Sequence, residues 1–187
     1  DVSLITNMSN LFDGKNTFND DISSWDVSSV TNMTFMFAGA HNFNGDISNW
    51  DVSSVTNMSH MFRLASSFNG DISSWDVSSV TNMSGMFRSG SNGSSFNGDI
   101  SSWDVSSVTN TSGMFDYATS FNGDISSWDV SSVANMTSMF DNANALSDGN
   151  KCAIHNSFQS NDAWPYDWEE SCQNNYSLSF GGDGDYT

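Results

Sequence analysis

The stretch that decides the fold is FNGDISSWDVSSVTNMSGMF, residues 68–87, because close copies of it fill most of the chain. Its centre, W-D-V-S-S-V, occurs five times within 187 residues. A catalytic site is normally assembled once, from unlike residues. A phrase repeated this closely instead indicates a structural unit that stacks on copies of itself.

The copies follow one another at a nearly fixed spacing. Aligned on the leading apolar residue, they are separated by 25, 25, 28, 25 and 25 residues. The long step contains the insertion RSGSNGSS, with its three extra residues near 89–95, and this composition is typical of a loop. Such a period predicts a repeat solenoid, in which each coil buries its apolar face only against its neighbours. The aligned positions are Phe18, Phe43, Phe68, Phe96, Phe121 and Leu146.

Apolar residues alternate with Ser, Asp, Thr, Asn and Gly within one copy. Trp75 and Val77 are two residues apart, so a short strand would direct both inward and Asp76 outward. Equivalent strands would form a short parallel sheet, about 4.8 Å from coil to coil. The segment MFRLASSF predicts one helical or 3₁₀ turn. An internal tryptophan ladder is expected from Trp25, Trp50, Trp75, Trp103 and Trp128.

The composition limits the partners that this chain can have. Its formal net charge is −18, with only four Lys and Arg residues. An acidic surface repels phosphates, so nucleic acid and anionic membranes are poor partners. With 37% hydrophobic residues and 14 Phe, the chain is too apolar to be disordered. No apolar run reaches the roughly 18 residues of a membrane span.

The repeat also defines the domain organisation. Residues 1–145 form the predicted solenoid, whose first repeat is partial. Residues 146–172 break the period and contain both cysteines and the single proline, which fits a cap over the open apolar end. Cys152 and Cys172 are predicted to form a disulfide. This pairing favours an oxidising, extracellular location.

The repeat resembles a known family. The pattern I-x-x-W-x-V-x-x-V-x-x-M-x-x-M-F-x-x-A-x-x-F, found between Asp1 and about Asn144, resembles the BspA-like leucine-rich repeats of bacterial and protist surface proteins. It is most similar to the W-D-V-S-S-V variant that also occurs in mycoplasma lipoproteins and marine microbes. The resemblance implies a leucine-rich-repeat-like solenoid on a secreted or surface protein, with a role in adhesion or attachment and no enzyme activity.

Two columns of aspartate follow the repeat. Equivalent carboxylates in neighbouring coils would lie roughly 5 Å apart, where like charges repel. Hydrogen bonds from nearby serines, specific calcium binding, or a diffuse counterion cloud could each offset this repulsion. Calcium is the only cofactor that the sequence suggests. The outward strand column is Asp26, Asp51, Asp76, Asp104 and Asp129, and the second is Asp21, Asp46, Asp71, Asp99 and Asp124.

An N-x-Ser/Thr glycosylation sequence recurs in every coil. Glycans on every coil would crowd one another, so the alternative is a half-buried asparagine that bonds to the backbone. The two sequences outside this column have more room for a sugar. The column is Asn7, Asn32, Asn57, Asn82, Asn110 and Asn135, and the outlying pair is Asn92 and Asn175.

Nothing in the sequence predicts catalysis. His41, His60 and His155 are isolated, and no nucleophile or phosphate-binding motif is visible. The repeated carboxylates have equivalent surroundings, which would not give one an acid role and another a base role. We therefore expect a protein that is not an enzyme.

The two ends suggest a means of assembly. The first copy lacks its front half, so Val2 and Ile5 would lie on an open apolar face. Near the other end, Tyr176, Leu178 and Phe180 alternate with serines, which predicts an extended strand within residues 173–187. This strand could dock on the open coil of another copy and form a head-to-tail filament. The alternative is that the chain is a fragment of a longer one.

These observations favour an extracellular structural or attachment protein, whose main partner is itself, end to end. A calcium- or carbohydrate-binding adhesion module, with surface glycans as partners, is one alternative. An ice-binding solenoid is another, although outward aspartate in place of threonine argues against it.

Overall fold

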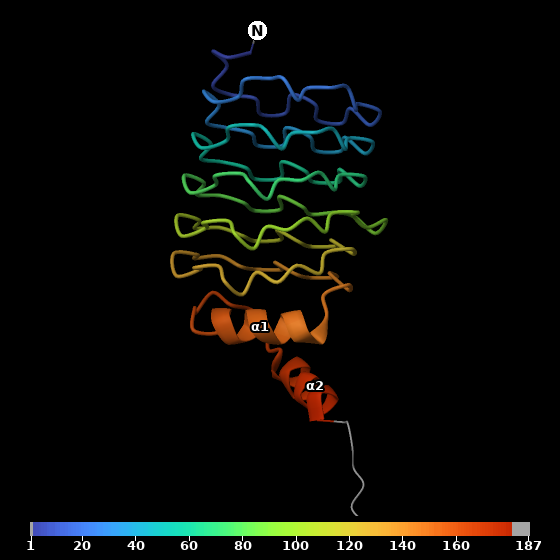
Figure 1. Ribbon diagram of the computed structural model, residues 1–187, viewed down its shortest axis with the longest axis vertical. Coiled ribbons are helices and arrows are strands. Elements are labelled where there is room, and N and C mark those ends of the chain that lie inside the picture. Colours follow the sequence, from blue (N-terminus) through green and yellow to red (C-terminus); the bar gives the residue numbers. More distant parts are fainter. Residues whose placement is uncertain (1, 181–187) are drawn as a thin grey trace, which may run out of the picture.

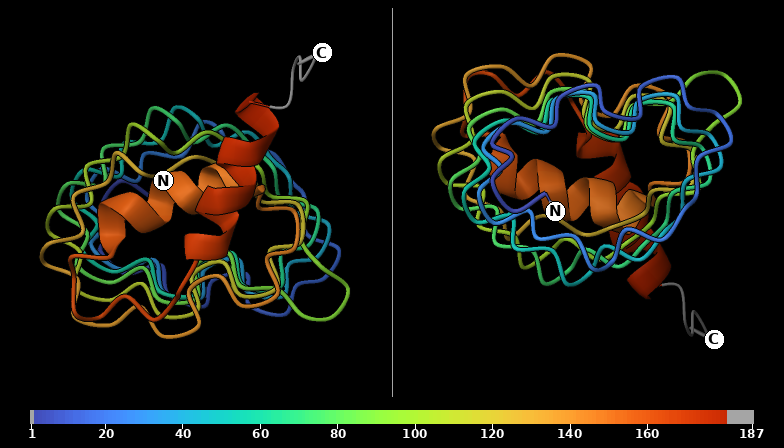
Figure 2. Two further views of the ribbon diagram at one scale, coloured as in Figure 1. Left: turned by 90° about the horizontal axis from the view of Figure 1, so that it is seen from below. Right: turned by 90° about the horizontal axis from the view of Figure 1, so that it is seen from above.

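The computed structural model describes the backbone of residues 2–180 and the side chains of residues 2–174. It shows a stack of flat coils followed by two helices, α1 (Asp148–Phe158) and α2 (Glu169–Phe180) (Figure 1). Seen along the stack, the coils superimpose closely, and α1 lies across one end of them (Figure 2). Each coil takes one period of the sequence, so equivalent residues lie above one another.

Backbone hydrogen bonds join each coil to the next at every second residue along one edge. The Met58 N–H donates to the Asn82 carbonyl at 3.0 Å, and the His60 and Phe62 N–H groups donate to the same neighbouring coil. Local turns fill the gaps, as where the Met61 N–H donates to the Met58 carbonyl. N–H groups thus donate alternately to the next coil and to a local turn, and this pattern needs one residue per coil with left-handed backbone angles. In this coil the residue is His60, with φ 57°. The equivalent residues are Asn10, Phe35, Gly85, Gly113 and Ser138.

The coils contain less regular structure than the sequence analysis expected. Among the described residues, the parallel pairing consists of single bridges at the asparagines 7, 32, 57, 82, 110 and 135, and no continuous strand is formed. Trp75 and Val77 lie between two serine turns, and the Trp75 and Val80 N–H groups bond locally to the Ile72 and Val77 carbonyls. The predicted helical segment at residues 61–68 likewise consists of turns.

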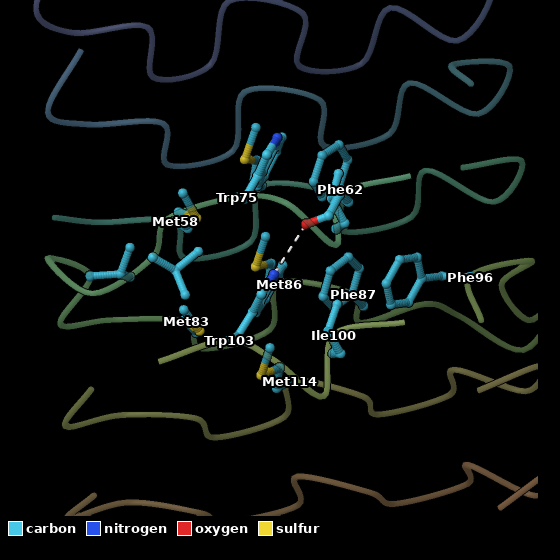
Figure 3. Packing of buried hydrophobic residues seen from close by; sticks show 14 of the residues in the cluster. Met58, Phe62, Trp75, Met83, Met86, Phe87, Phe96, Ile100, Trp103 and Met114 are labelled. Carbon is cyan, nitrogen blue, oxygen red and sulfur yellow. Dashed lines mark hydrogen bonds between the residues drawn. The ribbon is translucent and has the colours of Figure 1, made fainter. Parts of the chain in front are cut away.

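Aromatic columns fill the interior of the stack. Phe62 and Phe68 stack within one coil with their ring centroids 3.9 Å apart, and Phe62 lies 5.8 Å from Phe87 in the next coil. Trp75 and Trp103 lie one above the other beside this phenylalanine column (Figure 3). Because neighbouring coils contribute the same residues at the same height, each phenylalanine ring of an inner coil has an equivalent partner on both sides.

The tryptophans also carry polar bonds that the sequence analysis did not foresee. The Trp75 indole N–H donates to the Ile47 carbonyl of the preceding coil at 3.1 Å. Trp50, Trp103 and Trp128 donate in the same way to Ile22, Ile72 and Ile100. All four are buried, whereas Trp25 in the first complete coil is half-buried. Tryptophan therefore supplies apolar area and a coil-to-coil hydrogen bond from one side chain.

The cap closes the last coil by taking over bonds that another coil would make. The Phe140 N–H donates to the Tyr166 hydroxyl at 2.8 Å, where the equivalent Phe115 N–H donates to a carbonyl of the next coil. The Asn161 side-chain amide donates to the carbonyls of Val130 and Val133. Buried Ile154 and Phe158 of α1 cover the apolar end.

Two expectations about the C-terminal part have different outcomes. The Cys152–Cys172 disulfide is confirmed, and it links α1 to α2. The predicted strand is not seen, because residues 176–180 belong to helix α2. The side chains of Tyr176, Leu178 and Phe180 lie outside the described part of the chain, as do residues 181–187.

Candidate functional surfaces

The outward aspartates are used by the turns that follow them. Asp76 Oδ1 accepts hydrogen bonds from the Ser78 backbone N–H at 3.1 Å and from the Ser78 hydroxyl at 2.6 Å. Asp71 accepts equivalent bonds from Ser73. The same aspartate-to-serine turn recurs at both columns in every coil: Asp26, Asp51, Asp104 and Asp129, and Asp21, Asp46, Asp99 and Asp124.

These bonds outweigh the repulsion between neighbouring carboxylates. The Ser78 hydroxyl, followed by the Ser78 N–H, lowers the pKa of Asp76. At Asp46 the two bonds from Ser48 also lower the pKa, although Asp21 and Asp71 in the adjacent coils act in the opposite direction. Within residues 2–174, no three acidic, histidine or cysteine side chains gather as a metal site would require. The geometry thus favours the turn role over a calcium ladder.

The asparagines of the recurring glycosylation sequence form turns of the same kind. Asn82 Oδ1 accepts the Ser84 N–H at 3.0 Å, and each of the other five accepts the N–H two residues on. The four inner asparagines are half-buried, whereas Asn7 and Asn135 at the ends are exposed. Asn92 is exposed in the inserted loop, and the Asn175 side chain lies outside the described residues. Asn92 is therefore an accessible position for a glycan outside the column.

One side of the stack differs from coil to coil, and we call it the variable arc. It comprises residues 9–17, 34–42, 59–67, 84–95, 112–120 and 137–145. Phe35 and His60 stack there with centroids 4.5 Å apart, but the next two equivalent positions are glycines. The column of large side chains consequently stops after His60.

A hollow of about 420 Å³ lies where this column stops. Arg88 and Asp116 form an ion pair on its wall, with Arg88 Nε 3.1 Å from Asp116 Oδ2. The His60 Nδ1 atom is buried there without a hydrogen-bond partner. Burial lowers the pKa of His60, and the charges of Arg63 and Arg88 lower it further. His60 is therefore a neutral ring at the edge of the hollow at pH 7.

The first coil exposes apolar side chains that the inner coils bury. Leu11 is 43% exposed, whereas the equivalent Met36 is fully buried; Leu4, at 88% exposed, stands where the inner copies have serine. Ile5 is also exposed, and Val2 is half-buried. Phe12, Phe18 and Trp25 are likewise covered only in part. Within the described residues, the first coil is thus covered on one side only, and the segment predicted to dock on it lies in helix α2 as far as Phe180.

The sequence analysis missed the residues that close the cap and line the hollow. Tyr166 and Asn161 act through bonds to the last coil, which no local pattern shows. The hollow had a detectable signal, because the residue three positions after the repeated asparagine changes from Phe35 and His60 to Gly85 and Gly113. Comparing the copies position by position would have separated the variable arc from the constant part.

Comparison with known proteins gives a family. Residues 1–93 and 90–164 match the family described as "Mycoplasma protein of unknown function, DUF285". Comparisons with curated proteins and with solved structures give no match. Within residues 2–180, no helix is long and apolar enough to cross a membrane. Since the matched segments cover most of the stack and the cap, the chain belongs to this Mycoplasma family of unknown function.

Proposed function

We propose that this chain is a leucine-rich-repeat-like rod on the outside of a cell, with a structural or attachment role. The observation that carries the proposal is the repetition of one set of contacts from coil to coil. The Trp75 indole bond, the Phe62–Phe68 stack and the Asp76 turn each recur at nearly every level. The constant part of the repeat is thereby accounted for by stacking.

The extracellular location rests on two further observations. The Cys152–Cys172 disulfide closes a cap of two helices, and disulfides of this structural kind persist in oxidising environments. The chain as a whole has 22 acidic residues and only four Lys and Arg residues. This excess of negative charge suits a protein that is surrounded by salt solution. The family match to a Mycoplasma protein group is compatible with a surface protein and gives no function of its own.

Deleting one complete period tests the structural role. A variant without residues 46–70 would join equivalent positions, since residues 45 and 70 are both glycines at the same place in successive coils. It should fold and be shorter by about 4.8 Å, the spacing of one coil. Deleting residues 46–57 is the control, because it leaves half a coil and should unfold the protein. Small-angle X-ray scattering and circular dichroism measure both results, and unfolding of the full-period variant would contradict the proposal.

End-to-end association is a second candidate, favoured by Ile5 and Leu11 of the first coil, which are exposed where the equivalent Val30 and Met36 are buried. The partner would be a second copy, in a pair of open coils or as a head-to-tail filament. Because helix α2 replaces the predicted strand, the contact would be apolar packing of the open coil, and not strand exchange. Leu11→Asp should lower the association measured by light scattering, while Ser79→Asp on the exposed side of an inner coil should not. Equal association of Leu11→Asp and the unaltered chain would exclude this face.

A further inference from the structure

The departures from the repeat are concentrated in one region of the variable arc. Gly85 and Gly113 replace large residues, and the three-residue insertion follows Arg88 directly. Thr111, directly before the arc, stands where the five other copies have methionine, and it is buried with its hydroxyl directed at Met139 Sδ. The constant residues explain stacking, but stacking does not require these changes. Their common location indicates that they serve something else.

Space for a ligand exists because Gly85 and Gly113, which have no side chain, occupy the positions that follow Phe35 and His60 in successive coils. A Cβ atom built on Gly85 would lie 2.3 Å from His60 Nδ1, so the imidazole ring occupies that position. A Cβ atom on Gly113 would meet nothing nearer than Asp116 Cβ at 4.0 Å. The hollow therefore opens at Gly113, with His60 as its wall on one side. Its volume of about 420 Å³ is within the range of small-molecule sites, roughly 300–1,000 Å³.

The lining of the hollow is rich in groups that both donate and accept hydrogen bonds. Ser84, Ser112 and Thr137 contribute hydroxyl groups. Arg88 keeps Asp116 paired through Nε, and its side chain is 46% exposed. His60 adds a flat neutral ring, which offers apolar surface with a polar edge. The wall thus combines hydroxyls, a planar ion pair and one ring.

We propose that this hollow binds a neutral saccharide of one or two rings. A sugar presents hydroxyls to serine, arginine and aspartate, and its C–H surface can lie against the His60 ring. An apolar ligand would leave the hydroxyls that line the hollow without partners. An acidic ligand would be repelled by Asp116 and by the net charge of −18. This inference goes beyond the structural role, and it holds whether or not copies associate end to end.

Gly113→His tests the site with a side chain that the fold already accepts. His60 occupies the equivalent position with φ 57°, close to the φ of 60° at Gly113, and the new ring would fill the hollow. Gly14→His is the matched control, because Gly14 also has positive φ, at 68°, and a Cβ there meets nothing within 4 Å. Ser112→Ala is a second variant, which removes one hydroxyl and keeps the backbone bonds of the turn.

The assay is an array of neutral oligosaccharides, with sialylated and sulfated ones as a second arm, followed by calorimetric titration of the best neutral hit. The full chain should bind neutral sugars, with binding at least about tenfold weaker in Gly113→His and unchanged in Gly14→His. Ser112→Ala should bind about fivefold more weakly, so the site remains testable if Gly113→His is unstable. No binding to neutral sugars, binding to acidic ones alone, or binding unchanged in Gly113→His and Ser112→Ala would overturn the proposal. Such a failure would leave the deletion experiment on the rod unaffected.

Discussion

Replacing Tyr166 by phenylalanine removes one hydroxyl group at the closed end of the stack and leaves the ring in place. That hydroxyl accepts the Phe140 N–H at 2.8 Å and donates to Asp141 Oδ1 at 2.8 Å. Burial raises the pKa of Tyr166, so the hydroxyl stays protonated and can donate throughout the neutral range. The single group therefore links the cap to two consecutive residues of the last coil.

The expected loss follows from the Phe140 N–H, which has no other acceptor after the substitution. Leaving a buried donor without a partner costs about 1–3 kcal/mol. The ring should remain packed against Trp168, 4.9 Å away, so the buried apolar area changes little. We expect Tyr166→Phe to lower the free energy of unfolding by about 2 kcal/mol. For a chain of this size, the melting temperature should fall by about 4–8 °C.

Thermal melting followed by circular dichroism and tryptophan fluorescence measures this effect, since Trp164 and Trp168 report on the cap. Tyr117→Phe is the control: Tyr117 is half-buried, and its hydroxyl makes no hydrogen bond among the described residues. The control should lie within about 0.5 kcal/mol of the unaltered chain. If Tyr166→Phe were as stable as Tyr117→Phe, the proposed closure of the last coil by Tyr166 would be wrong.

Three further predictions concern the cap and the turns. The double variant Cys152→Ser and Cys172→Ser should lose about 2–4 kcal/mol in denaturant unfolding, because the disulfide closes a loop of 20 residues; unchanged stability would show that the helices hold the cap without it. The lowered pKa values of Asp26, Asp76 and Asp104 predict stability that is present above about pH 4 and is lost as the pH falls through the folded-state values. This acid loss should be shallower after Ser28, Ser78 and Ser106 are changed to Ala. Added calcium should leave the melting temperature unchanged, because the turns already use the aspartates, and a rise would favour the calcium ladder instead.

The burial of the constant residues could be predicted from the sequence, because large apolar side chains are normally buried. In the segment 68–87, the tryptophan, valine, methionine and phenylalanine side chains are buried in the structure. The place of the backbone pairing could not be predicted in this way. Serine turns interrupt the segment around Trp75, and the bridge falls at Asn82, a residue with low strand preference. Here the bonds to adjacent coils override local propensity.

The remaining features depend on contacts between distant residues. Tyr166 and Phe140 are 26 residues apart, and nothing near either of them indicates their bond. The hollow arises from residues of successive coils, so it is invisible within any single copy. At residues 176–180, the alternation of apolar residues and serines was too short to distinguish a strand from helix α2.

Hydrogen exchange at the tryptophan indole N–H groups tests the stacked-coil account most directly. The indole groups of Trp50, Trp75, Trp103 and Trp128 donate to carbonyls of the preceding coil and are buried. Trp25, in the first complete coil, is half-buried and makes no such bond to the described residues. Nitrogen-15 spectra resolve these few signals. The account predicts slow exchange for the four and fast exchange for Trp25. Exchange at Trp75 and Trp103 as fast as at Trp25 would contradict it.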